Sequence, residues 1–261
     1  MNRPTRLLII TGLALALLVV ALLLPPMPQD PEYHNFADRR MLLGIPNFFD
    51  VISNLPFLLI GTLGLAFVWR QFKLQKGERF VEKSELVPYA LFFAGIVLTS
   101  MGSTYYHLAP DNGRLAWDRL PLSLVFVSFL AAVIAERINL KVGLALLLPL
   151  AILGLNSVIY WNLSEMKGAG DLRLYLVVQL GPMLLIPLII LLFPARYTRT
   201  GDLWGVVGFY AVAKVLEMLD GPIFALGNLL SGHTLKHLVS ALAVSWVLRM
   251  LHLRRPVQHQ G

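Results

Sequence analysis

The sequence predicts an all-α integral membrane protein, and three observations support this prediction. Of the 261 residues, 57% are hydrophobic and only 14% are charged, against roughly 45–50% apolar and about 25% charged residues in soluble domains. Apolar runs long enough to cross a bilayer, about 17 to 25 residues each, recur along the whole chain. No stretch between them is suited to a soluble domain, so we expect a single integral membrane domain over residues 1–261.

Eight membrane helices are expected from the apolar windows and from the charges, prolines and glycines that bound them. They lie near residues 7–24, 51–69, 87–107, 119–136, 142–161, 172–193, 203–220 and 232–251. The first run follows Arg3 and Arg6, as in a signal peptide, but it is long and has no clear small-residue cleavage site. We therefore expect a transmembrane bundle with a seven-helix core over about residues 45–253 and one extra N-terminal helix over about residues 7–24.

The basic residues predict the orientation of the bundle. One side of the eight-helix topology is rich in them and carries Arg3, Arg6, Arg70, Lys73, Lys76, Arg79, Lys83, Arg137, Lys141, Arg196, Arg199, Arg254 and Arg255, whereas the opposite side is poorer in basic residues. The other side carries Asp111, Glu165 and Asp171. The positive-inside rule then places both termini in the cytoplasm and the loop of residues 25–50 outside. Since topology accounts for the net charge of +7, no nucleic-acid partner is expected, and nothing in the sequence requires a protein partner.

Three histidines are the strongest candidates for a metal site. The chain has no cysteine, so a metal must use His, Asp, Glu or backbone oxygen. His107 ends the third predicted helix, while His233 and His237 begin the last one, four residues apart and therefore on one helix side. All three reach the outer face in a topology derived from Lys and Arg alone, which favours convergence on one metal. The alternative for each histidine alone is a polar helix end in contact with water or head groups.

Ser103 and Asp118 are the candidate catalytic residues. Ser103 precedes His107 by one helical turn, which suits a hydrogen bond to a substrate carbonyl; small hydroxylated residues also serve as packing positions between membrane helices. Asp118 begins the next predicted helix, where its carboxylate suits a general base or a partner of a ligand imidazole. An N-cap of that helix or a salt bridge to Arg119 explains Asp118 equally well.

Other polar groups of the predicted bundle have supporting roles. Lys214 and Glu217 are three residues apart in a membrane helix, which favours a structural ion pair. Asp220 and Tyr106 are candidates for positions beside the metal ligands. A proton-coupled transporter, which is one alternative function, would spread ionisable residues across the membrane. Here they cluster toward the outer side, which argues against a transporter.

The order of these motifs resembles the alkaline ceramidase family, within the wider CREST group of membrane hydrolases. The similar features are STYYH over residues 103–107, Asp118 eleven residues later, and HTLKH over residues 233–237 in the last helix. The segment NFFDVISNLPFLLIG over residues 47–61 also resembles the first conserved helix of the family. The resemblance covers roughly residues 45–250.

The resemblance implies a Zn²⁺ ion held by His107, His233 and His237, a site completed by Ser103 and Asp118, and hydrolysis of the amide bond of ceramide to a fatty acid and a sphingoid base. Other lipid amides or esters would suit the same zinc chemistry. The wider group also contains adiponectin-receptor-like proteins, so a metal-containing receptor without hydrolysis is the main rival; a pure receptor would not need Asp118.

The resemblance also raises the question of calcium. Eukaryotic members of the family bind Ca²⁺ through an acidic segment before the first core helix. The matching segment here offers Asp38, Asn47 and Asp50 as oxygen ligands, but its acidic cluster is thin and two arginines lie inside it. Calcium is therefore a weaker expectation than zinc.

Overall fold

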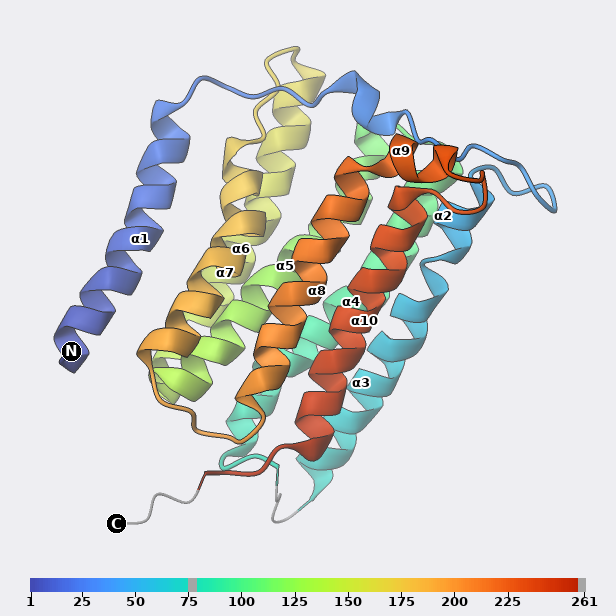
Figure 1. Cartoon of the computed structure of the whole chain (residues 1–261). Coiled ribbons are helices and arrows are strands. Elements are labelled where there is room, and N and C mark those ends of the chain that lie inside the picture. Colours follow the sequence, from blue (N-terminus) through green and yellow to red (C-terminus); the bar gives the residue numbers. More distant parts are fainter. Residues whose placement is uncertain (75–78, 258–261) are drawn as a thin grey trace.

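The computed structural model describes residues 1–74 and 79–257 and shows a bundle of helices (Figure 1). Lys76, one of the basic residues used to orient the chain, lies outside these ranges. Helices make up 77% of the structure, and the described residues form no strand. The predicted all-α class is confirmed.

The elements follow the predicted windows closely. In chain order they are α1 (Arg3–Leu23), η1 (Pro31–His34), α2 (Phe48–Ile52), α3 (Leu55–Lys73), η2 (Lys83–Glu85), α4 (Leu86–Leu108), α5 (Asn112–Arg137), α6 (Leu140–Met166), α7 (Arg173–Leu192), α8 (Thr200–Met218), α9 (Asp220–Ala225) and α10 (Gly232–Leu253). Within the described ranges, seven helical segments are long and apolar enough to cross a membrane.

The predicted span at residues 203–220 corresponds to α8, a helix of 19 residues that is not one of these seven. Its sequence carries Asp202, Lys214 and Glu217, three charges that lower its fitness for a lipid environment. The helix packs against α10 along its length (Figure 1). The two charged side chains near the C-terminal end of α8, Lys214 and Glu217, line a cavity inside the bundle that is described below.

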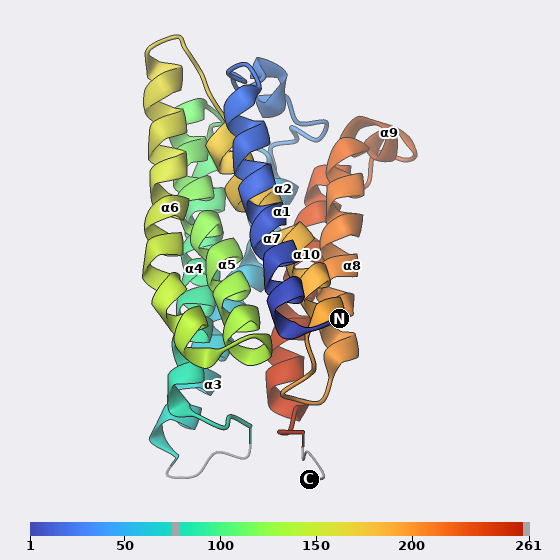
Figure 2. The ribbon, with the colours of Figure 1, turned by 90° about the vertical axis from the view of Figure 1, so that its left-hand side faces the viewer.

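The last helix, α10, packs against helices from distant parts of the chain. α10 packs on α8 and α3, while α5 lies between α4 and α6. α1 contacts α7 at the edge of the bundle, with most of its side chains exposed (Figures 1 and 2). The N-terminal end of α1 and the C-terminal end of α10 lie toward the end of the bundle opposite α9 (Figure 1). The N-terminal helix is thus an addition at the edge of the core, as the sequence predicts.

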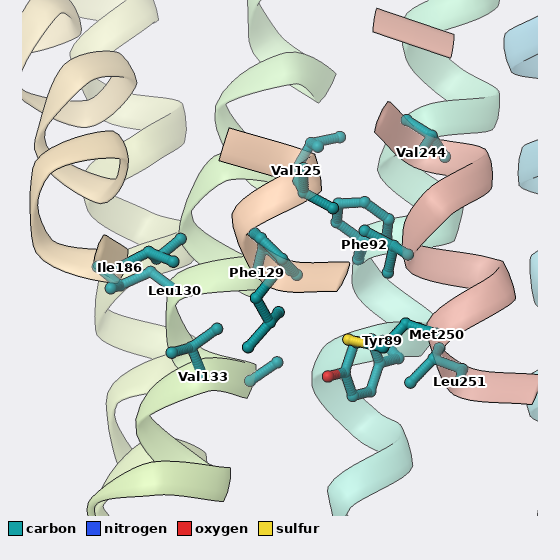
Figure 3. Packing of buried hydrophobic residues seen from close by; sticks show 14 of the residues in the cluster. Tyr89, Phe92, Val125, Phe129, Leu130, Val133, Ile186, Val244, Met250 and Leu251 are labelled. Carbon is teal, nitrogen blue, oxygen red and sulfur yellow. The ribbon is translucent and has the colours of Figure 1, made fainter. Parts of the chain in front are cut away.

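The apolar core lies in the half of the bundle nearer the termini, where α4, α5, α7 and α10 meet. Phe92 and Phe129 face each other there with ring centroids 5.5 Å apart (Figure 3). Nearer the opposite end, α4 and α5 approach at Gly102, where an added Cβ would lie 2.1 Å from the carbonyl oxygen of Trp117. A larger residue would separate the two helices. Because Ser103 and Asp118 adjoin this contact, the glycine also sets the distance between the two candidate catalytic side chains.

Candidate metal centre

The structure brings His107, His233 and His237 together at the end of the bundle near α9. Their ring centroids are 4.9 to 5.0 Å apart in all three pairs. One candidate ligand nitrogen from each ring lies within 4.8 Å of the others, and all three side chains are buried. The convergence expected from the helix ends is therefore present in the fold.

The start of α10 is fixed by groups that leave the imidazoles free. The side chain of Ser231 caps the helix by accepting from Thr234 N at 3.1 Å. Asp220 accepts from His233 N at 2.7 Å, so this predicted supporting residue holds the backbone and not the ring. A Cβ on Gly232 would lie 2.2 Å from Leu216 O, so glycine allows α10 to begin against α8. Together these contacts place His233 and His237 on the inner face of α10.

Ser53, which the sequence did not single out, orients His237. Its hydroxyl lies 2.8 Å from His237 Nδ1 and donates its own hydrogen to Asp50 O at 3.0 Å. Because that hydrogen is already used, Ser53 accepts from Nδ1–H, and His237 Nε2 keeps its lone pair. A hydrogen bond of this kind to the second ring nitrogen is the usual support of a metal-bound histidine.

The other two rings also suit a metal, with one competing contact. His107 Nδ1 is buried without a hydrogen-bond partner among the described residues, and Asn47 Nδ2 donates to the backbone oxygen of His107 at 2.8 Å. Lys236 Nζ lies 3.2 Å from His233 Nε2, and an ammonium can only donate. A metal on that nitrogen would displace Lys236. Three buried neutral nitrogens without a thiolate are a donor set that zinc accepts.

A segment of the first loop covers the histidines, and we call residues 29–37 the strap. The ring of Phe36 packs against His107 and His233 in tilted arrangements, at 4.7 and 4.6 Å between centroids. Ala37 N donates to Asp220 at 2.9 Å, and the hydroxyl of Tyr106 lies 2.9 Å from His34 Nδ1. Tyr106 therefore binds the strap through its hydroxyl, and its ring lies 4.9 Å from that of His107 between centroids. Aromatic residues in a polar loop gave no periodic signal from which this cover could be predicted.

A cavity of about 160 Å³ opens beside the histidines. His237, Ser103 and Asp118 line it near the metal candidates, and Phe129 and Val247 line it deeper in the core. Its polar end thus adjoins the histidines, whereas its other end is apolar. The structure places both candidate catalytic residues where a group inside the cavity would meet them.

Asp118 has neither of the structural roles that the sequence left open. The N-cap of α5 is Asp111, whose side chain accepts from Arg114 N at 2.7 Å. Among the described residues, Asp118 forms no salt bridge, and Arg119 forms none either. The carboxylate of Asp118 faces the cavity beside Ser103, which leaves it free for a proton-transfer role.

The predicted Lys214–Glu217 pair is present at 2.6 Å, and it belongs to a larger network in the cavity. Lys236 also binds Glu217, at 2.9 Å, and Tyr33 of the strap donates to the same carboxylate at 3.3 Å. Burial, with the nearby charge of Glu217, raises the pKa of Tyr33, so its hydroxyl stays protonated. The network joins the strap to α8 and α10.

The three candidate calcium ligands have separate partners. Both carboxylate oxygens of Asp38 accept from Arg40, and the amide of Asn47 bonds to His107 O. Asp50 accepts from Thr234 Oγ1 at 2.6 Å through Oδ1, while its buried Oδ2 has no hydrogen-bond partner in the described part of the chain. These contacts join the first loop to α4 and α10.

Comparison with known proteins identifies no relative. No protein-family model matches the chain, and no curated protein matches it. The fold and the site together define a membrane helix bundle with a buried three-histidine cluster. The features that bear on its function are this geometry and the motif order in the sequence.

Proposed function

We propose that this protein is a zinc-dependent membrane hydrolase that cleaves the amide bond of ceramide or a related lipid amide. One observation carries the proposal: three buried, converging histidines adjoin a cavity that Ser103 and Asp118 also line. The motif order that resembles the alkaline ceramidases supports the same assignment. Three imidazole ligands and a tetrahedral preference favour zinc among the common divalent ions.

The side chains of the cavity suit amide hydrolysis. A bound zinc ion would supply a Lewis acid that polarises the carbonyl and activates water at neutral pH. Asp118 accepts a proton from the attacking water and returns it to the leaving amine. Ser103 donates a hydrogen bond to the carbonyl oxygen as charge develops there. The C–N bond breaks, a C–O bond forms, and the products are a carboxylic acid and an amine.

The apolar end of the cavity explains why the substrate should be a lipid. From His237 to Val247 the lining descends ten residues of α10, or about 15 Å at the rise of an α-helix, a depth that holds an extended alkyl chain of about twelve carbons. A chain bound there has its carbonyl beside Ser103 and Asp118. The sphingoid character of the amine comes from the motif resemblance alone.

The membrane placement proposed here follows the basic residues. Arginines and lysines dominate the connections on the side of the termini, which we assign to the cytoplasm. The histidine cluster then lies near the outer face, periplasmic or luminal. Cysteine accessibility mapping of single substitutions in the strap and in the loop between α5 and α6 would contradict this assignment if the strap reacted only from the cytoplasmic side.

The decisive experiment combines metal content with activity. Zinc per chain is measured by mass spectrometry on detergent-purified wild-type protein, His233→Ala and His252→Ala, and fatty-acid release from ceramide is assayed on each. His252 is the matched control, because it lies on the same helix but is exposed outside the cluster. We expect one zinc and activity in the wild type and control, with both lost in His233→Ala.

Each other outcome changes the proposal in a defined way. Zinc without release of fatty acid from any lipid amide or ester would refute the hydrolase and leave a metal-containing receptor. Zinc with hydrolysis of another lipid amide or ester would keep the chemistry and replace ceramide. Absence of metal from the wild type, after purification without chelators and reloading with zinc, would refute the metal centre.

A further inference from the structure

Arg119 is a buried cation that forms no salt bridge within residues 1–74 and 79–257. Only 6% of its surface is exposed, and its one side-chain hydrogen bond goes from Nη2 to Gln29 Oε1 at 2.7 Å. Nη1 is buried without a partner among the described residues. Asp118 precedes it, but adjacent side chains of a helix do not face each other, and the two form no salt bridge. Burial of a charge without a partner is costly.

Arg254 at the other end of the bundle shows what a structural arginine looks like in this protein. Each of the two guanidinium groups is surrounded by three aromatic rings. For Arg254 these are Phe80, Tyr89 and Tyr197 at 4.0 to 5.4 Å, and for Arg119 they are Tyr33, Trp161 and Tyr175 at 4.3 to 5.4 Å. Arg254 also binds the carboxylate of Glu136. Arg119 forms no such pair with a described residue: Asp118 precedes it on the helix, and the carboxylate of Glu165 is held by Trp161 Nε1 at 3.1 Å and by Gln29 N at 2.6 Å.

The position of Arg119 indicates where a counter-ion would come from. Arg119 lines the same cavity as Ser103 and Asp118, and its cage is closed on one side by Gln29 and Tyr33 of the strap. The lysine, arginine and carboxylate side chains that line the cavity are Asp118, Arg119, Lys214, Glu217 and Lys236. Glu217 is shared by Lys214 and Lys236. Three cations thus face two carboxylates, which leaves one positive charge in excess.

We propose that Arg119 binds the anionic head group of the substrate, and that the substrate class is therefore an N-acyl amino acid, a lipid amide whose amine carries a carboxylate. This inference rests on the proposed function. An acyl chain in the apolar end of the cavity places the amide carbonyl at Ser103 and Asp118 and directs the amine toward the strap, where Gln29 and Tyr33 contact the guanidinium of Arg119. The carboxylate supplies the counter-ion, and a charge-assisted hydrogen bond forms.

The test compares two amides that share an acyl chain and differ in one group. N-dodecanoylglycine carries a carboxylate, whereas N-dodecanoylethanolamine carries an uncharged hydroxyl. Hydrolysis of each is measured on wild-type protein, Arg119→Gln, Arg119→Lys and Arg114→Gln. Arg114 is the matched control, because it lies on the same helix and pairs with the exposed Asp111 outside the cavity. Binding of both amides is also measured on His233→Ala and on the same variant with Arg119→Gln.

We expect wild-type protein and Arg114→Gln to prefer the glycine amide. In Arg119→Gln, kcat/KM for the glycine amide should fall about ten- to a hundredfold, as for loss of one charged hydrogen bond, while the ethanolamine amide is unaffected. Arg119→Lys should restore part of the preference, because it keeps the charge without the forked geometry. A residue needed only for folding would lower both activities equally, and that result would overturn the proposal.

Failure of this inference and failure of the proposed function give different results. Equal hydrolysis of both amides by the wild type would refute the anion site and retain the hydrolase. Absence of hydrolysis, with selective binding of the glycine amide to His233→Ala that Arg119→Gln abolishes, would retain the anion site and refute the hydrolase. Dodecanoic acid is added as a competitor; if Arg119→Gln weakens binding of this acid alone, the arginine holds the released product and the substrate proposal is wrong.

Discussion

Replacement of Ser53 by alanine tests whether the histidine cluster is built to bind metal. Ser53 is 4% exposed, and its hydroxyl links His237 Nδ1 at 2.8 Å to Asp50 O at 3.0 Å. Ser53→Ala removes the acceptor of the Nδ1 hydrogen, so the ring loses both its fixed tautomer and its orientation. A buried hydrogen bond that is left half-made costs about 1–3 kcal/mol, which corresponds to about 5- to 150-fold in an equilibrium constant. Loss of such a partner typically weakens metal affinity about 10- to 100-fold.

The assay is competition for zinc between the purified protein and a chromogenic chelator of known affinity. Ser100→Ala is the matched control: Ser100 is also 4% exposed and its hydroxyl donates to Asn54 O at 2.8 Å, beside Ser53 but without contact to an imidazole. We expect Ser53→Ala to lose about 10- to 100-fold in zinc affinity and Ser100→Ala to bind as the wild type does. Equal affinities for all three proteins would refute the argument that Ser53 fixes His237, and equal losses would show a packing effect.

Three further predictions address the reaction, the packing and the loops. Asp118→Asn should abolish hydrolysis while one zinc remains bound, because the amide cannot accept the proton; full turnover would refute its role. Gly102→Ala should lower stability by about 1–3 kcal/mol and reduce turnover, since an added Cβ meets Trp117 O at 2.1 Å. Gly181→Ala is the control and should change neither, because nothing lies within 4 Å of an added Cβ there. Thermal unfolding in detergent compares the stability of the two variants. The hydrogen bond from Arg173 lowers the pKa of the Asp171 carboxyl from 3.8 to about 2. The ionised carboxylate therefore contributes its full stability above pH 3.8, and this contribution is lost as pH falls through about 2. Asp171→Asn should flatten the fall in melting temperature between these two pH values, and an unchanged pH profile would contradict this.

Hydropathy was enough to predict the helices because a membrane-spanning helix must satisfy its own backbone and present apolar side chains over its whole length. The eight predicted windows each contain a helix. α8 shows the limit of that reasoning, because its apolar run is interrupted by Asp202, Lys214 and Glu217, and both carboxylates bind basic residues of α10. Only the fold shows that Glu217 meets Lys236 of α10 and Tyr33 of the strap.

The residues of the site likewise divide into those that the sequence predicts and those that only the fold shows. His107, His233 and His237 could be brought together from the sequence because helix ends of known topology define a common face. Ser53, Phe36 and Arg119 carried no such signal. Ser53 lies just after the short helix α2, where the chain bends into α3, and Phe36 lies in an irregular loop; neither follows a helical period. The alternatives for Asp118, an N-cap or a pair with Arg119, are equally compatible with its position in the sequence, and only the fold excludes both: Asp111 is the N-cap of α5, and Asp118 forms no salt bridge among the described residues.

The strap and the cavity together determine how a substrate reaches the histidines. Phe36 covers the rings of His107 and His233, and of the three candidate ligands only His237 lines the cavity. A reacting carbonyl must therefore approach from the cavity, on the side that Ser103 and Asp118 share. Since the deeper lining is apolar, a small polar amide that reaches the same carbonyl position leaves that lining empty and gains no burial of apolar surface. Selection for a lipid chain thus follows from the direction of approach, and selection for a charged head group follows from the unpaired arginine at the polar end.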